Sequence, residues 1–256
     1  MNKRRGREIK ELKEKYVESS DKTRIYYQLR EGTSQEGFPE VLFFVHGIGG
    51  SVTGWDKVCS SIRNIGKTSF TLIFMDIRAH GFSEKPKDAS SCSMKNVAED
   101  VQAILDAETI KKVTLIGHSF GSLCLPFCYR LFPGRIKNLI FIGSNASVSK
   151  DVCVKSGGSI LYALLYVMYL FPLTGMLFSG PGKHIDLSGV TYRHDFFSIG
   201  MYLRDVKQVG LCWYLPFMRQ VLDHDETETI KKIDIPSLIL HGDYDKIFLP
   251  SRAEEL

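Results

Sequence analysis

The chain has 256 residues, of which 44% are hydrophobic and 24% are charged, and this composition is typical of an ordinary globular protein. A chain of this length forms one large α/β domain or two small ones, and it buries roughly 70–75% of its unfolded surface. The net charge of +4 is too small to indicate a nucleic-acid partner.

The start of the chain carries a local excess of positive charge. Residues 1–15 contain seven Lys or Arg side chains against three Glu. Ile9, Leu12 and Tyr16 recur at helical spacing, which predicts a short basic helix within a separate segment, residues 1–18. Two interpretations are open: a solvated tail, or a peripheral contact with an anionic membrane surface, to which each basic residue adds about 1 kcal/mol.

The cysteines show no CxxC pair and no spacing with histidine that is typical of a metal site. No secretory signal is visible, because the basic start is followed by a charged run. The thiols are therefore expected to be reduced, as in a cytoplasmic protein, and no metal or cofactor is expected. They are Cys59, Cys92, Cys124, Cys128, Cys153 and Cys212.

Strand and helix signals alternate along most of the chain, which predicts an α/β fold: a mostly parallel sheet with helices on both faces. Strands are predicted at 23–29, 41–45, 71–77, 113–116, 137–142 and 236–240, and helices at 55–65, at 94–105 after Ser93 as N-cap, and at 120–132.

The alternation stops between about residues 145 and 228, where the chain is rich in aromatic residues. This stretch falls between two predicted strands, so we expect an inserted helical cap over the carboxyl edge of the sheet, where open α/β sheets bind ligands. Residues 161–178 carry no charge but contain Pro172. Three interpretations of this segment remain open: a helix of the cap or core, an interfacial segment, or a membrane span.

The strongest motif is Gly117-His118-Ser119-Phe120-Gly121, which lies between a predicted strand and a predicted helix. A serine on such a sharp turn is the arrangement of a nucleophile elbow. We therefore predict that Ser119 is the nucleophile of an acyl-transfer reaction.

A second motif, His46-Gly47-Ile48-Gly49-Gly50, follows the predicted strand 41–45. A glycine-rich turn presents backbone N–H groups, which stabilise the negative oxygen of an acyl-transfer transition state. The backbone N–H groups of Ile48 and Phe120 are the predicted oxyanion donors. A phosphate-binding loop is the competing reading, but no Gly-Lys-Ser/Thr follows.

Two further loops follow predicted strands. The loop from Asp76 through Arg78 and His80 to Ser83 is predicted to be tied down by Asp–Arg and histidine hydrogen bonds. In the loop after residues 236–240, Asp245 is the predicted carboxylate that orients a histidine, with Asp243 as the second choice.

These motifs, in this order, resemble the α/β-hydrolase superfamily, and most closely its serine esterase and lipase-like members with a helical cap. The resemblance runs from about Thr23 to the end and implies a hydrolase domain at 19–256. It implies a cofactor-free serine hydrolase acting on a small acyl substrate, with Ser119 as nucleophile and Asp245 as triad acid. The apolar cap favours a lipophilic substrate. Ala79 stands where the family usually has glycine.

The chain departs from this family because it has no histidine base after the predicted acid. Only eleven residues, none of them histidine, follow Asp245. The family places its histidine, last strand and last helix there. His184, His194 and His224 fall in the cap, and His118 adjoins Ser119 and should point away from it. Two hypotheses follow: an active hydrolase whose sequence is incomplete at its C-terminus, or an inactive hydrolase-like protein that binds a partner. The oligomeric state is not predicted.

Overall fold

The computed structural model describes residues 12–32, 39–64, 70–148 and 207–245, together with residues 160, 163, 166, 167, 248 and 256. The strands are β1 (Lys13–Glu18), β2 (Arg24–Arg30), β3 (Glu40–Val45), β4 (Phe70–Met75), β5 (Val113–His118), β6 (Ile136–Ile142) and β7 (Ser237–Leu240). The α-helices are α1 (Asp56–Asn64), α2 (Met94–Ala107), α3 (Phe120–Leu131), α7 (Leu211–Asp223) and α8 (Thr227–Ile230). Short 3-10 helices are η1 (Val52–Trp55), η2 (Ala89–Ser91) and η3 (Pro133–Arg135).

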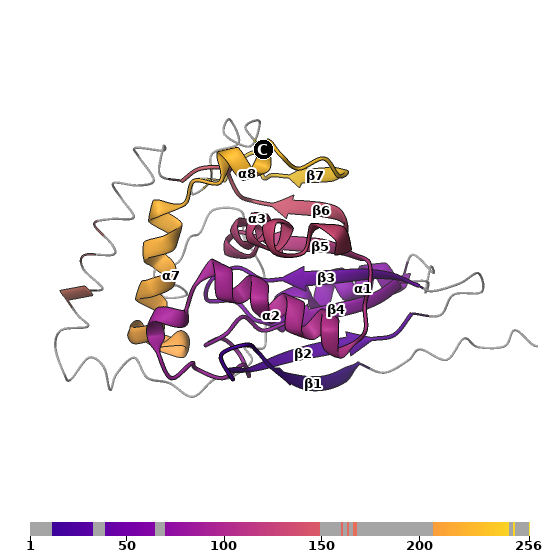
Figure 1. Cartoon of the computed structure of the whole chain (residues 1–256), viewed down its shortest axis with the longest axis horizontal. Helices are drawn as coiled ribbons and strands as arrows, with labels where there is room; N and C mark the ends of the chain where they lie inside the picture. Colours follow the sequence, from indigo (N-terminus) through magenta and orange to yellow (C-terminus); the bar gives the residue numbers. More distant parts are fainter. Residues whose placement is uncertain are drawn as a thin grey trace, which may run out of the picture.

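The strands form one sheet in the order β1-β2-β4-β3-β5-β6-β7 (Figure 1). β1 and β2 run antiparallel to their neighbours, whereas β4, β3, β5, β6 and β7 are parallel. The predicted mostly parallel sheet is confirmed. All six predicted strands are present. The apolar runs of the central strands β3, β4 and β5 are largely buried, as is typical of a parallel sheet covered on both faces.

The predicted basic helix at the start is wrong over its described part. Tyr16 lies in β1, opposite Tyr26 of β2. Tyr16 and Val17 suit a strand, and pairing with β2 outweighs the weak helical spacing. The sheet therefore begins at Lys13, inside the segment that was expected to be separate. Residues 1–11 lie outside the described residues.

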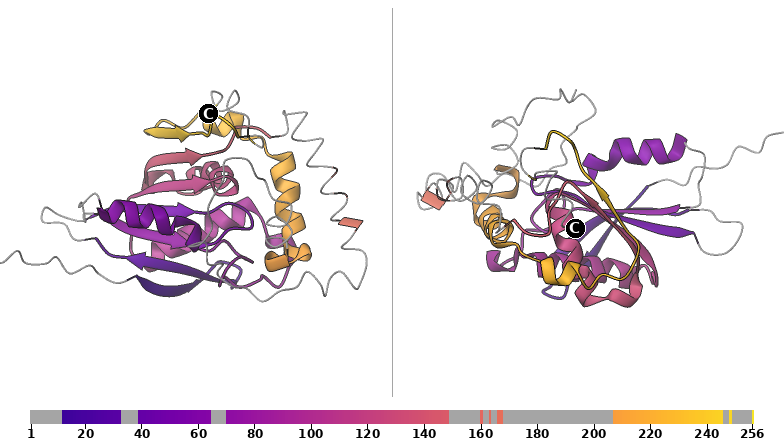
Figure 2. Two further views of the ribbon diagram at one scale, coloured as in Figure 1. Left: turned by 180° about the vertical axis from the view of Figure 1, so that it is seen from behind. Right: turned by 90° about the horizontal axis from the view of Figure 1, so that it is seen from above.

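Helices cover both faces of the sheet, as Figure 2 shows with α1 on one side and α2 and α3 on the other. Along β3, Phe43 and Val45 pack with α2 and α3, whereas Phe44 packs on Trp55 beside α1. Ser93 caps α2 as predicted, because its hydroxyl accepts the N–H of Asn96 at 3.0 Å.

The parallel strands end at one level. Val45 of β3 lies opposite Met75 of β4 and Gly117 of β5, and Ile142 of β6 lies opposite His118. The loops that follow these strands therefore emerge together at the carboxyl edge. Helix α7 stands beside that edge in Figure 1.

Helix α7 belongs to the predicted cap region and is fastened to the domain by polar contacts. Trp213 donates its indole N–H to the carbonyl of Pro86 at 3.0 Å. Gln220 accepts the N–H of Met94 and donates to the carbonyl of Cys92, each at 2.9 Å. Most of the remaining predicted cap region, including residues 161–178 except for three helical positions, lies outside the described residues.

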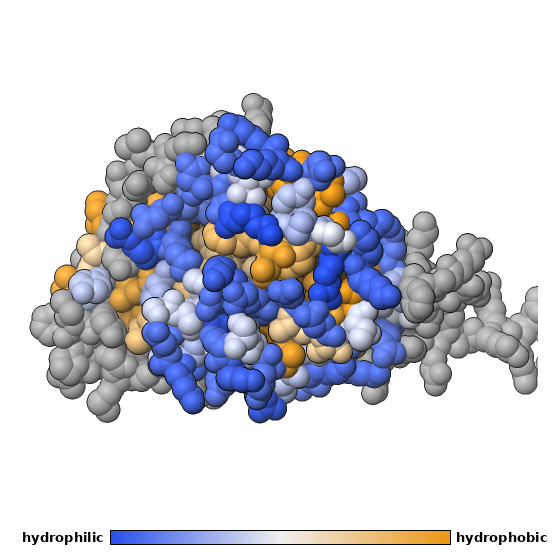
Figure 3. Space-filling view, viewed as in Figure 1, coloured by the Kyte–Doolittle hydropathy of each residue, from blue (hydrophilic) through white to orange (hydrophobic). Residues whose placement is uncertain are grey.

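Polar and charged side chains cover much of the face shown in Figure 3, with an apolar area among them. The last strand also exposes apolar side chains, since Leu238, Ile239 and Leu240 are each more than a third exposed. Every helix in the described ranges is too short or too polar to cross a bilayer.

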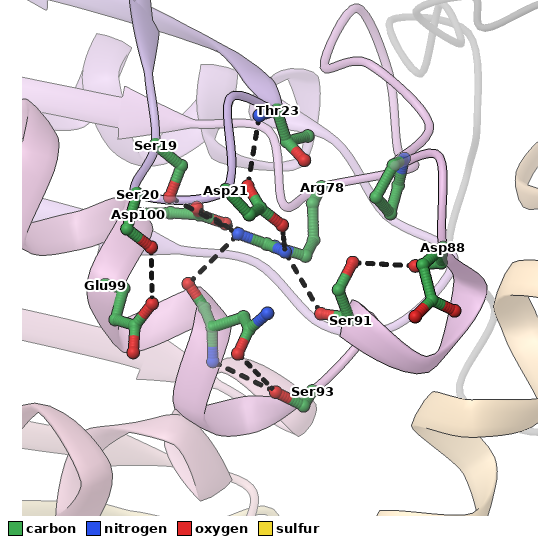
Figure 4. A network of polar contacts seen from close by, with 12 residues as sticks. Ser19, Ser20, Asp21, Thr23, Arg78, Asp88, Ser91, Ser93, Glu99 and Asp100 are labelled. Atoms are coloured by element: carbon green, nitrogen blue, oxygen red, sulfur yellow. Dashed lines mark hydrogen bonds and ion pairs between the residues drawn. The ribbon is translucent and has the colours of Figure 1, made fainter.

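A buried ion pair fixes the loop after β4 (Figure 4). The guanidinium of Arg78 donates to both carboxylate oxygens of Asp100 in α2, at 2.6 and 2.8 Å, and to Asp21 between β1 and β2 at 2.7 Å. Arg78 and Asp100 are fully buried. Burial raises the pKa of Asp100, and the hydrogen bonds and charge of Arg78 oppose that shift. Arg78 was expected to pair with an aspartate, and its partners come from two other elements and not from Asp76.

Removing one member of this pair leaves the other charge buried and uncompensated. We expect Asp100→Ala to lower the free energy of unfolding by about 3–5 kcal/mol in urea denaturation. Asp223→Ala, which breaks an exposed pair with Arg219, is the matched control and should cost less than about 1 kcal/mol. Equal losses in the two variants would contradict this account of the buried pair.

Candidate active site

Ser119 stands at the sharp turn between β5 and α3. Its backbone has φ 51° and ψ −118°, in a region that favours glycine, so the turn stores strain. The turn is held because Ser119 donates its backbone N–H to the carbonyl of Ile142 at 2.8 Å. The geometry is that of a nucleophile elbow, as the motif predicts.

Ser122 is a supporting residue that the sequence analysis missed. Its hydroxyl donates to the carbonyl of Gly117 at 2.6 Å and accepts the N–H of Ile142 at 3.0 Å. It thereby ties the start of α3 to β5 and β6. The only sequence signal was a small hydroxyl residue one position after the glycine of the motif.

Gly121 lets α3 begin against the end of β3. A Cβ atom on Gly121 would lie 2.2 Å from the carbonyl oxygen of Val45 and 2.7 Å from that of His46. Both obstacles are backbone atoms, so a side chain could fit only if β3 or α3 moved. This close approach brings the glycine-rich loop beside Ser119.

Gly47 makes the second close approach. A Cβ atom there would lie 3.2 Å from Cβ of Ser119 and 3.2 Å from Nδ1 of His118. The loop after β3 and the elbow are therefore in contact. Among the described residues, neither the backbone N–H of Ile48 nor that of Phe120 has a protein acceptor. Two donors without acceptors beside a serine suit a developing oxyanion.

The loop after β4 supports the glycine-rich loop through backbone and histidine contacts. Asp76 accepts the N–H groups of Val52 at 2.8 Å and Phe82 at 2.9 Å. His46 accepts the N–H of Ile77 at 3.0 Å, and His80 accepts the N–H of Gly49 at 3.0 Å. The prediction that histidine hydrogen bonds tie down this loop is confirmed.

Ala79 occupies the position where the related family usually has glycine. Its φ is +64°, a conformation that favours glycine. The alanine methyl group is buried in the hydrophobic core that also contains side chains of α2 and α3.

The acidic loop after β7 reaches the same edge. Asp245 is half-buried, and its Oδ2 lies near Gly143 just after β6, 3.6 Å from where a Cβ on that glycine would stand. Its other oxygen accepts the N–H of Phe248 at 3.0 Å. Asp243, the second choice, is exposed to solvent.

No described histidine ring bonds the Ser119 hydroxyl. Backbone groups engage both ring nitrogens of His46 and of His80. The ring of His118 packs edge-on against Trp55. His184 and His194 lie outside the described residues. In those same ranges, no three His, Cys, Asp or Glu side chains converge as metal ligands would.

His224, at the end of α7, is buried, and its Nε2 has no hydrogen-bond partner in the described structure. Burial lowers its pKa to about 4. The ring is therefore neutral in the folded protein at neutral pH.

Replacement of Gly121 tests the contact between β3 and α3. We expect Gly121→Ala to lower the free energy of unfolding by more than about 3 kcal/mol, because its methyl group meets backbone on two sides. Gly134→Ala is the matched control, since nothing lies within 4 Å of its added Cβ, and it should change stability by less than about 0.5 kcal/mol. Equal urea midpoints for the two variants would show that the close approach is not required.

The buried His224 predicts a loss of stability in acid. An unfolded histidine takes up a proton near pH 6.5, whereas folded His224 does so only near pH 4. Between these values the unfolded state binds more protons, so stability falls as the pH is lowered. We expect the free-energy difference between wild type and His224→Gln to shift by up to about 1.4 kcal/mol per pH unit over this window, and to stay constant above pH 7. A difference independent of pH would refute the assignment.

Comparison with known proteins places this geometry in a family. Residues 40–171 match the family model described as alpha/beta hydrolase fold. Protein ABHD8 of Bos taurus is 30% identical over 115 residues, which are 44% of this chain and 26% of the relative. The chain thus matches about a quarter of the length of that relative.

Solved structures share the architecture. A hydrolase from Pseudomonas aeruginosa PA01 has a TM-score of 0.67 and 18% identity, over 94% of this chain and 84% of that one. The enol-lactonase from Burkholderia xenovorans LB400 has a TM-score of 0.64 and 18% identity, over 94% and 86%. At this identity the likeness shows the fold. Together with the family model, which covers half of the sequence, it shows that the chain belongs to the alpha/beta hydrolase fold family.

Proposed function

We propose that this protein is a serine hydrolase that cleaves a carboxylic ester or a related acyl bond through an acyl-enzyme on Ser119. One observation carries the proposal. A strained serine stands in contact with a loop whose Ile48 N–H, like the N–H of Phe120, has no acceptor among the described residues.

The reaction proceeds in two steps. Ser119 Oγ bonds to the substrate carbonyl carbon while its proton passes to a base, and the carbonyl oxygen becomes negative. The N–H groups of Ile48 and Phe120 stabilise that oxygen. Collapse of the intermediate breaks the bond to the leaving alcohol, which takes the proton. Water then attacks the acyl-enzyme and releases the carboxylic acid and free Ser119.

Asp245 is proposed as the acid that orients the base. Its position at the carboxyl edge beside Gly143 supports this role, as does the exposure of Asp243.

The proposed substrate has an apolar acyl chain. Phe217 of α7 packs edge-on against Phe120, with ring centroids 5.1 Å apart, and Phe217 is fully buried. The aromatic sequence of the cap region supports the same class. The structural relative from Burkholderia xenovorans LB400 is an enol-lactonase, and lactone cleavage is also the cleavage of an acyl bond.

A second candidate function is that of a hydrolase-like binding protein. The observation that favours it is that no described histidine bonds the Ser119 hydroxyl. A serine without a base stays protonated and is a poor nucleophile. This candidate retains the acyl-binding edge but turns over no substrate.

The two candidates differ in their reaction with a serine-directed fluorophosphonate. A hydrolase forms a covalent adduct on Ser119, detected as a mass increase of the whole chain, and Ser119→Ala abolishes it. Ser60→Ala, which removes an exposed hydroxyl on α1, is the matched control and should keep Ser119 labelled. Labelling of the Ser119→Ala variant would contradict the assignment of Ser119 as nucleophile. A folded wild-type protein that does not react with the fluorophosphonate would favour the binding protein.

A further inference from the structure

His80 is fully buried between two loops and makes one hydrogen bond to each. Nδ1 lies 3.0 Å from the carbonyl oxygen of Arg78, which can only accept, so Nδ1 carries the proton. Nε2 lies 3.0 Å from the backbone N of Gly49, which can only donate, so Nε2 is unprotonated. The hydrogen-bond partners therefore define a neutral ring with one tautomer.

The surroundings keep this ring neutral. Burial lowers the pKa of His80 to about 3. His46 and Lys85 act in the same direction, whereas the Arg78 carbonyl and Asp76 oppose it. A protonated ring could no longer accept from Gly49, so the low pKa preserves that bond across the physiological range.

The carbonyl to which His80 donates is itself fixed. It belongs to Arg78, whose side chain is bound to Asp100 and Asp21 (Figure 4). The ion pair therefore anchors one end of a chain of contacts that runs from Arg78 through the His80 ring to Gly49. Gly49 is the immediate neighbour of Ile48.

Phe217 of α7 packs against the His80 ring and also against Phe120. Its ring centroid lies 5.7 Å from that of His80 and 5.1 Å from that of Phe120. Phe217 thus contacts both His80, which is bonded to Gly49 beside Ile48, and Phe120, which carries the second N–H group.

We propose that His80 is a positioning residue for the oxyanion hole: its neutral ring, seated against Phe217, holds Gly49 and thereby aims the Ile48 N–H at the substrate oxygen. The inference rests on the proposed acyl-transfer function. Its effect falls on the transition state and not on substrate binding, because the oxyanion develops only during the reaction.

The test is the rate of covalent labelling by a fluorophosphonate, resolved into its maximal rate kinact and its binding constant KI. We expect His80→Ala to lower kinact at least about tenfold and to leave KI within about twofold, since loss of an oxyanion donor slows the bond-making step. His80→Gln, whose amide oxygen can accept from Gly49, should recover most of kinact.

A matched control separates positioning from general destabilisation. Tyr27→Phe removes a buried hydroxyl that donates to Glu108 at 2.5 Å, away from the two loops. We expect it to lower the melting temperature while kinact stays within about twofold of wild type. An unchanged kinact in folded His80→Ala would overturn the proposal, and so would an equal loss in Tyr27→Phe.

A second readout does not require reaction. Nitrogen NMR of His80 should show a proton on Nδ1 only, at pH 7 and at pH 5, and hydrogen exchange at the Gly49 amide should accelerate at least about tenfold in His80→Ala. If the wild type is never labelled, the proposed function fails while these signals still decide the role of His80. A proton on Nε2 at pH 7, or unchanged exchange at Gly49, would overturn it.

Discussion

The candidate site depends on one close approach, between the start of α3 and the carbonyl group of Val45 at the end of β3. Only glycine at position 121 allows it, since a Cβ atom would stand 2.2 Å from that oxygen. The loop of Gly47 is in contact with Ser119, so Ile48, which follows Gly47, and Phe120, which follows Ser119, both lie in segments that meet at the serine. The register between β3, β5 and β6 places the carboxyl ends of these strands, and hence the loops that follow them, at one level.

Two kinds of polar group keep these loops in place. The buried Arg78–Asp100 pair fixes the loop after β4. The rings of His46 and His80 connect that loop to the glycine-rich loop by hydrogen bonds. Both histidines are bonded on both nitrogens, so they are structural parts of the loops and are not available as bases. Helix α7, from the region predicted to form a cap, is held by hydrogen bonds of Trp213 and Gln220, and its Phe217 contacts Phe120 of the elbow.

Much of the fold and of the candidate site was predictable from the sequence, because the patterns that specify them are local. The elbow, the glycine-rich loop and the strands before them are written in consecutive residues, and their patterns specify both secondary structure and chemistry. The basic start was misjudged because three apolar residues at helical spacing are a weak signal beside pairing with β2. The partners of Arg78 lie 22 and 57 positions away in the sequence, and the contact of Phe217 with His80 spans still more. No spacing rule reveals such contacts before the chain is folded.

The central claim is that Ser119 faces an oxyanion hole made by the Ile48 and Phe120 amides. A crystal structure of the whole chain after reaction with a fluorophosphonate tests it most directly. The account predicts phosphorus bonded to Ser119 Oγ, with the phosphonyl oxygen within hydrogen-bond distance of both N–H groups. A phosphonyl oxygen directed to solvent, or held by other donors while both amides stay unengaged, would contradict it.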